Sequence, residues 1–159
     1  MHPTKTRIVY CKDANRTGKY PDQSFDFLGY TFRPRKVKNK HNQRFVSFTP
    51  AVSKASLHSM REKIRGLHIR RWTHAALDDI ARKINPILRG WIAYYGRYCP
   101  SALYPLYRHV NKTLVSWARR KYKRLKGSKT RTGVWLQSLA RKNPGLLVHW
   151  QQNTIGAFN

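Results

Sequence analysis

The sequence predicts an α+β protein, in which a small antiparallel β lobe is followed by a mostly α-helical bundle of three to four helices. Aromatic and β-branched residues stand between turn-forming residues in the first 50 positions, whereas from residue 53 the apolar residues recur at helical spacing. The chain also carries 33 Lys+Arg against 6 Asp+Glu, a formal net charge of +27. A folded chain with this excess repels itself unless a polyanion neutralises it, so nucleic acid is the expected partner.

The β lobe is expected over residues 1–52. Residues 7–11 form a short apolar strand, and residues 44–48 return antiparallel to the aromatic-rich segment 25–32. The connection, residues 36–43, is then a protruding basic loop. Five of the eight residues at 33–40 are cationic, and three of them are candidate contacts to nucleic acid: Arg35, Lys36 and Lys38.

Apolar periodicity predicts the helices. Ser53 is the expected N-cap of the first, the second starts near Thr73, Ser101 caps the third, and a short fourth covers residues 134–139. The predicted core stripes hold Leu57, Met60, Ile64 and Leu67 in the first helix, Leu77, Ile80, Ile84, Ile87, Leu88, Trp91 and Tyr95 in the second, and Leu103, Leu106, Tyr107, Val110, Leu114 and Trp117 in the third.

Cations lie opposite these stripes. No acidic side chain follows Asp79, although 16 Lys+Arg do, and eight of the thirteen residues at 119–131 are cationic. A basic run without interspersed acids favours binding to a phosphate backbone over a merely solvated face. The candidate contacts are Arg82, Arg89, Arg97, Arg108, Lys112, Arg119, Arg120, Lys123, Arg124 and Lys126.

Aromatic residues cluster around the join of the second and third helices. Trp91, Tyr95 and Tyr107 lie on the core stripes, so we expect them to pack inside. Tyr94 and Tyr98 fall off the stripes and are the candidates for stacking on unpaired bases.

The residues offer no catalytic centre. Asp78 and Asp79 fall in the first turn of a predicted helix, where free N–H groups and the helix dipole favour acids. The seven histidines form no metal-ligand cluster, and no glycine-rich phosphate loop is present, so neither a metal nor a cofactor is expected. No apolar run predicts a membrane span or a secretory signal, and two lone cysteines suit a reducing cytoplasm.

Several ordered segments resemble one known family. Residues 84–96, INPILRGWIAYYG, resemble the maturase-specific domain (domain X, the thumb) of group II intron reverse transcriptases. Residues 25–32, FDFLGYTF, resemble the block that closes the palm and holds the primer end. Residues 2–9, HPTKTRIV, resemble the block before it. Residues 115–122, VSWARRKY, continue the thumb, and residues 147–150, LVHW, resemble the usual ending of bacterial members.

The resemblance implies palm strands at 1–52, domain X at 53–131, and a short helix with a C-terminal tail at 132–159. It also implies a primer-grip-like motif at Phe27, Leu28, Gly29 and Tyr30, and a nucleotide-proximal lysine at Lys5. The metal-binding aspartates of the family's Tyr-x-Asp-Asp motif do not occur in this sequence, so whether the chain takes part in catalysis stays open. The expected partner is group II intron RNA, another structured RNA or an RNA–DNA duplex.

Three alternatives to an RNA-binding module without catalytic activity remain open at this point. The chain could complete a reverse transcriptase in trans with a separate fingers–palm polypeptide. It could be a generic basic protein, ribosomal or DNA-packaging in type, or a truncated remnant without a selected function. A preference for intron RNA over other structured RNA separates the module from the generic protein.

Overall fold

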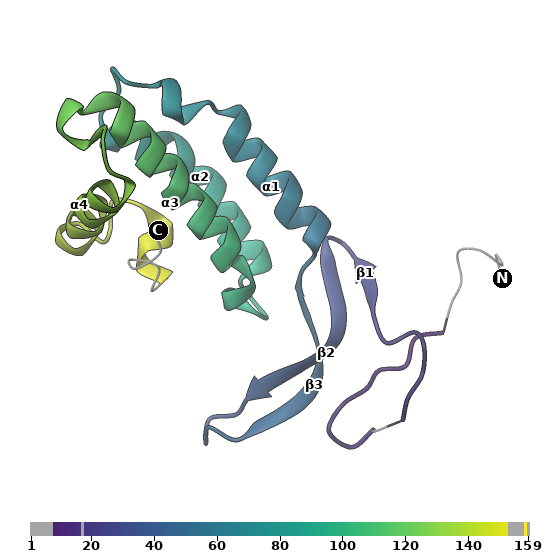
Figure 1. The fold of residues 1–159 in the computed structure, drawn as a ribbon. Helices are drawn as coiled ribbons and strands as arrows, with labels where there is room; N and C mark the ends of the chain where they lie inside the picture. Colours follow the sequence, from purple (N-terminus) through teal and green to yellow (C-terminus); the bar gives the residue numbers. More distant parts are fainter. Residues whose placement is uncertain (1–7, 17, 153–157, 159) are drawn as a thin grey trace. The chain divides into compact units, whose positions relative to one another are not determined.

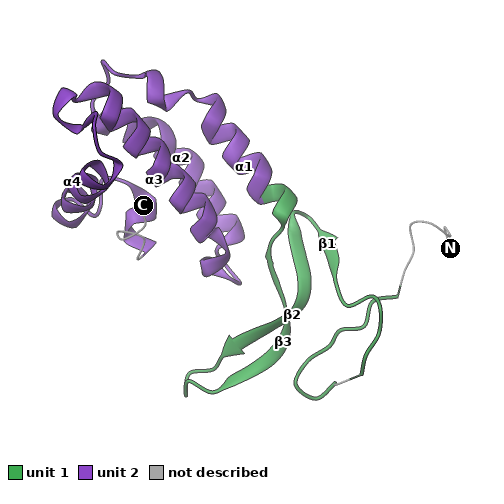
Figure 2. Cartoon of the chain, in the orientation of Figure 1, with its two compact units in different colours: residues 1–56 green, residues 57–159 purple. Residues whose placement is uncertain are grey.

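The computed structural model describes residues 8–16, 18–152 and 158. A three-stranded antiparallel sheet precedes four α-helices, which confirms the predicted α+β class (Figure 1). The chain divides into two compact units, residues 1–56 and residues 57–159 (Figure 2), and each is described by itself. Lys5, for which the resemblance implies a nucleotide-proximal position, lies outside the described residues.

The first unit is built on three strands in the order β1-β2-β3. They are β1 (Phe25–Phe27), β2 (Tyr30–Lys38) and β3 (Arg44–Val52). The expected antiparallel direction of the return is observed, but the expected partners are wrong. Residues 44–48 pair with residues 34–38, and within the segment 25–32 β1 pairs with the start of β2 across a tight turn. The basic loop is shorter than predicted, because pairing continues to Lys38 and only residues 39–43 turn. Backbone and side-chain hydrogen bonds between Asn39 and Gln43 close that turn.

The predicted strand at residues 7–11 is wrong for its described part, residues 8–11, which have no regular secondary structure. Ile8 is 93% exposed, whereas Val9, Tyr10 and Cys11 are only partly buried. The Tyr10 N–H donates to the Asp22 carbonyl at 2.8 Å, and the Tyr10 and Tyr20 rings lie 4.3 Å apart. An apolar run of this length forms a strand only where a partner strand satisfies its backbone.

The second unit contains most of the helical structure. The α-helices are α1 (Lys54–Gly66), α2 (Leu77–Tyr95), α3 (Tyr104–Lys121) and α4 (Lys129–Lys142). Short 3-10 helices connect or follow them: η1 (Ile69–Arg71), η2 (Pro100–Leu103), η3 (Lys123–Leu125) and η4 (Val148–Gln152). Only the first three residues of α1 fall within the first unit.

The ends of the helices differ in part from those predicted. Ser53 caps α1 as expected, since its Oγ accepts from the Ser56 N–H at 3.1 Å. Helix α2 begins at Leu77, not near Thr73, and the Asp79 carboxylate accepts from the Ala76 N–H at 2.8 Å. Ser101 lies inside η2 and does not cap α3. Helix α4 begins after Ser128 and is longer than predicted, and the domain limit expected after residue 131 falls inside it.

The core of the second unit follows the predicted stripe of α3. All six of its stripe residues are buried, and Trp117 lies at the centre of the packing with no exposed surface. The Trp117 Nε1 donates to the Trp72 carbonyl at 2.8 Å, which fixes the segment after η1 to α3. A buried indole N–H cannot bond water and needs a partner inside the protein, and the Trp72 carbonyl is that partner.

The stripe of α2 is buried only in its first half. Leu77, Ile80, Ile84 and Leu88 are buried, whereas Trp91 and Tyr95 are only half-buried, so the expectation of core packing fails for these two aromatics. The Lys63 ammonium lies 6.0 Å from the Trp91 ring, within cation–π range. Periodicity gives the direction in which a side chain points, but it does not say whether another element covers that part of the helix.

Trp91→Ala is therefore expected to lower the free energy of unfolding by only about 1–2 kcal/mol, less than half of what a fully buried indole contributes. Thermal unfolding followed by circular dichroism measures the change. A loss above about 4 kcal/mol would contradict the half-exposed position.

The C-terminal segment, expected as a short helix and a tail, contributes buried side chains to the core. Leu147, His149 and Trp150 are buried, as is Phe158. The Asn111 Oδ1, on α3, accepts from the Trp150 Nε1 at 3.2 Å and lies 2.8 Å from the His149 Nε2. Because an indole N–H can only donate, the Asn111 atom is the acceptor and the His149 Nε2 carries the proton.

Candidate nucleic-acid interface

The densest basic run, residues 119–131, covers the turn from α3 to α4, which we call the corner, and does not follow one helix face. Residues 119–121 end α3, η3 follows, and α4 begins at Lys129. Two cations of the run bind backbone carbonyls. The Arg119 guanidinium donates to the Lys126 carbonyl at 2.9 and 3.2 Å, and the Lys121 Nζ donates to the Ala75 carbonyl at 2.7 Å. These hydrogen bonds stabilise the backbone conformation of the corner.

The other predicted cations of this surface are exposed. They are Arg108 and Lys112 on α3 and Arg120, Lys123, Arg124 and Lys126 around the corner. The Arg124 guanidinium lies 5.9 Å from the Trp135 ring, whose other neighbour is the Tyr122 ring at 5.1 Å. No acidic side chain belongs to this stretch of sequence, which favours the approach of phosphates to the exposed cations.

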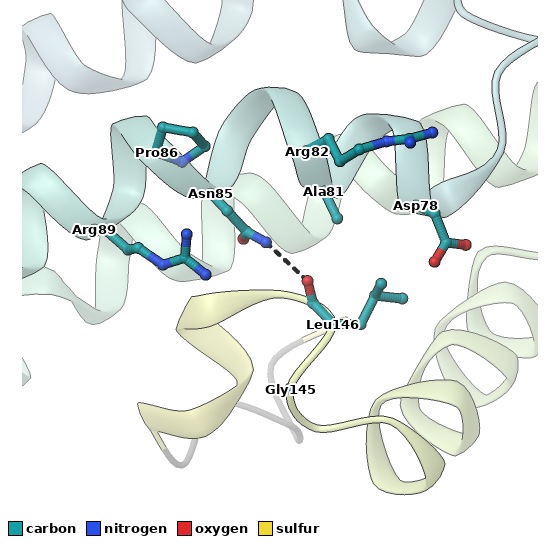
Figure 3. A pocket seen from close by; sticks show the side chains of 8 residues that line it. All are labelled: Asp78, Ala81, Arg82, Asn85, Pro86, Arg89, Gly145 and Leu146. Atoms are coloured by element: carbon teal, nitrogen blue, oxygen red, sulfur yellow. Dashed lines mark hydrogen bonds between the residues drawn. The ribbon is translucent and has the colours of Figure 1, made fainter.

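A pocket of about 490 Å³ separates α2 from the loop before η4 (Figure 3). Arg82 and Arg89 line it, as predicted for exposed cations of α2, together with Asn85. The Asn85 side chain bridges the backbone of the loop, donating to the Leu146 carbonyl at 2.9 Å and accepting from the Val148 N–H at 3.0 Å. Asn85 therefore connects α2 to the C-terminal segment, a role that its place in the sequence motif did not reveal.

The two arginines of this pocket differ in electrostatics. The Arg82 guanidinium forms an ion pair with the Asp79 carboxylate. The Ala76 N–H and then Arg82 hold the pKa of Asp79 below its usual range, which agrees with a capping function for this acid. Arg89 has no ion pair among the described residues, so its charge is the more available of the two.

The stacking candidates lie at and beyond the end of α2. Tyr94 is 47% exposed and Tyr98 is 58% exposed, so both present ring surface to solvent. The Tyr94 and Tyr95 rings meet edge to face at 4.7 Å, and the Arg97 guanidinium lies 5.9 Å from the Tyr98 ring. Arg97 is exposed as predicted, but it follows the last residue of α2.

The cations of the β2–β3 hairpin divide into two kinds. Arg35 is half-buried and donates to the Thr49 and Thr31 carbonyls, both at 3.2 Å, so it stabilises the hairpin itself. Lys36 and Lys38 are exposed. Lys38 stands directly opposite Arg44, and like charges at such a position repel each other unless an anion binds between them.

The primer-grip-like motif forms the tight turn between β1 and β2. Phe27 pairs with Tyr30, and both turn residues have positive φ, 47° at Leu28 and 80° at Gly29. The Gly29 carbonyl accepts from the Ser53 N–H at 2.8 Å and from the Ser56 Oγ at 3.0 Å. Tyr30 is buried, whereas Phe27 is 59% and Leu28 67% exposed, so the turn presents an apolar tip.

The described residues contain neither a candidate membrane span nor a candidate metal site. No helix there has the length and the apolar character that crossing a membrane requires. Likewise, no three histidine, cysteine or acidic side chains of the described part come together as a metal site would require.

A cation-rich helical unit preceded by a small antiparallel sheet defines a class of basic α+β proteins suited to polyanions. Residues 57–135 match the family model described as the group II intron maturase-specific domain. About half of the chain, between the start of α1 and the middle of α4, therefore belongs to that family, which confirms the resemblance to the maturase-specific domain. No curated protein and no solved structure matches the chain.

Proposed function

We propose that the chain is an RNA-binding module of the maturase type, which grips group II intron RNA and assists splicing or mobility. One observation carries this proposal: the segment that matches the maturase-specific domain also presents exposed cations in a stretch of sequence without acids. In a complete reverse transcriptase the same surface would hold the template–primer duplex. Neither role requires a catalytic group in this chain.

The geometry of RNA explains how such a surface works. The major groove of an A-form helix is too narrow for side chains, so cations bind phosphates and polar groups reach the 2′-hydroxyls of the minor groove. The module would favour the folded intron by binding it more tightly than misfolded forms, which shifts a population and breaks no bond.

The proposed contacts follow from exposure. On the helical unit they are Arg89, Arg97, Arg108, Lys112, Arg120, Lys123, Arg124 and Lys126, with Tyr94 and Tyr98 as stacking residues, and on the hairpin Lys36 and Lys38. Arg35, Arg82 and Arg119 would contribute less, because each guanidinium already binds a carbonyl or a carboxylate.

A salt titration of binding tests the proposal. A folded group II intron RNA is compared with an unrelated structured RNA of equal length, because any strongly cationic protein loses affinity as salt rises. We expect the intron RNA to bind at least tenfold more tightly at roughly physiological salt. Coincident curves would contradict a maturase function and favour a generic basic protein.

Arg89→Gln is expected to weaken RNA binding and to lower the salt dependence by about one counterion. Arg82→Gln is the matched control, since it removes a cation from the same helix and the same pocket, but one that Asp79 already pairs. The control should have a smaller effect. Equal losses in the two variants would show that the ion pair does not matter to RNA binding.

A second function has its own support. The exposed apolar tip formed by Phe27 and Leu28 offers a surface for another polypeptide, and the resemblance assigns this motif to a palm. The chain would then complete an RNA-directed DNA polymerase in trans with a fingers–palm subunit. Copurification of a polypeptide with a Tyr-x-Asp-Asp motif, lost in Leu28→Glu, would support this function. Retention of that polypeptide by Leu28→Glu would contradict the role of the tip.

A further inference from the structure

A second pocket of the helical unit lies apart from the one in Figure 3. It has a volume of about 330 Å³ and is lined by residues from the end of α1, from η1 and from α3. Its floor includes Ile69, which is 1% exposed, and its walls carry both polar and charged side chains. This volume falls at the lower end of the range for small-molecule pockets, about 300–1,000 Å³, and exceeds what a single phosphate fills.

Three cations line the pocket. Arg65 forms an ion pair with Glu62, whereas Arg70 and Lys112 have no ion pair in the part of the chain that the structure describes. Both are exposed, and they come from different elements, η1 and α3. Two unpaired cations at the rim of one pocket favour an anionic group there.

His109 provides the second, independent observation. Its Nε2 is buried and has no hydrogen-bond partner among the described residues, which is rare for a buried polar atom. Burial, followed by the nearby Arg65 and Arg61, lowers the pKa of His109, so the ring is neutral at pH 7. A neutral imidazole offers a flat face for stacking and a nitrogen that still needs a partner.

Two hydroxyls complete the lining. The Thr113 Oγ1 donates to the His109 carbonyl and the Ser116 Oγ donates to the Lys112 carbonyl, both at 3.0 Å. Each hydroxyl has therefore used its one proton and keeps acceptor capacity for the amino or hydroxyl groups of a ligand. The pocket thus combines an apolar floor, an aromatic ring, acceptors and unpaired cations.

We propose that this pocket binds a single unpaired nucleotide of the RNA, with the base against the His109 ring and the phosphate between Arg70 and Lys112. The inference rests on the proposed RNA-binding function and adds the form of RNA that is recognised. A base inside an A-form duplex is stacked and paired and cannot enter, whereas a bulged or looped base can turn outward.

The test compares a fully paired RNA duplex with the same duplex carrying one bulged nucleotide. Base stacking in protein sites typically contributes enough for roughly a tenfold gain, so the bulged RNA should bind about ten times more tightly. A bulge without a base should lose most of that gain. Equal affinity for paired and bulged RNA would overturn the inference while leaving RNA binding itself intact. If a bulge without a base bound as tightly as the complete bulge, the placement of the base in the pocket would be overturned.

Ser116→Trp fills the pocket without removing a charge. Position 116 is exposed on α3, so the variant should fold, with its duplex affinity unchanged and its preference for the bulge abolished. Ser138→Trp, at an exposed position of α4 that does not line this pocket, is the matched control and should keep the preference. Retention of the preference in Ser116→Trp would overturn the inference.

Arg70→Gln gives a second route that does not depend on fitting a bulky side chain. It should reduce the preference for the bulged RNA. Arg108 is an exposed cation of α3 that does not line the pocket, so Arg108→Gln should lower the affinity for both RNAs equally. If the two variants behaved alike, the cations would act only as a general phosphate surface and the nucleotide site would be excluded.

Discussion

Replacement of Trp150 by alanine is expected to lower the free energy of unfolding of the helical unit by about 3–5 kcal/mol. Trp150 is 1% exposed, and its indole packs edge to face on Phe158 with ring centroids 6.1 Å apart. The variant leaves a large cavity, and the Asn111 Oδ1 loses one of its two donors. Domains are typically stable by only about 5–15 kcal/mol, so this change removes a large part of the total.

Urea unfolding followed by circular dichroism measures the effect, and Trp91→Ala is the matched control. Both variants remove an indole, but Trp91 is only half-buried. If the C-terminal segment were a dispensable tail, Trp150→Ala would cost no more than Trp91→Ala. That outcome would contradict the packing of residues 147–150 into the core.

The parts of the fold that the sequence predicts well are those set by local rules. The stripe of α3 is buried throughout, because one continuous run of apolar residues at helical spacing specifies one inward face. The antiparallel direction of β3 was predictable for a similar reason, since two β-prone segments flank a turn-forming region, but the register was not. Ser53 caps α1 through a bond that depends only on residues three positions apart.

The predictions that failed concern contacts between residues that are far apart in the sequence. Asparagine is a residue type that is usually exposed, yet Asn111 is fully buried and its side chain contacts residues 38 and 39 positions away. Asn85 bonds residues 61 and 63 positions away. No local pattern contains this information, so the C-terminal segment was predicted as a tail.

The candidate site shows the same division. Exposure of the cations on α2 and α3 follows from helical spacing, and the structure agrees at Arg89, Arg108 and Lys112. The engagement of Arg119 with the Lys126 carbonyl depends on how the chain turns after α3, which the basic run does not encode. The pocket around His109 was missed altogether, because it is assembled from three elements. Seven histidines without metal spacing gave no signal for it.

Acidification from pH 7 to pH 5 is expected to destabilise the helical unit by roughly 2 kcal/mol. Burial lowers the pKa of His149 from its usual 6.5 to about 3. Between these values the unfolded chain binds a proton at this residue and the folded chain does not. Stability is therefore complete above about pH 6.5 and decreases as the pH falls toward 3. His109, whose pKa is also lowered, contributes in the same direction.

The His149→Gln variant isolates the contribution of His149. The glutamine amide can still donate to the Asn111 Oδ1 but does not titrate, so the variant should be less stable than the parent at pH 7 and should lose less stability at pH 5. The Ala76 N–H and Arg82 lower the pKa of Asp79, so this carboxylate stays ionised throughout the interval and adds no slope. Urea midpoints at the two pH values give the comparison. An identical loss in parent and variant would mean that His149 accepts a proton in the folded state as readily as in the unfolded chain, which would contradict its burial.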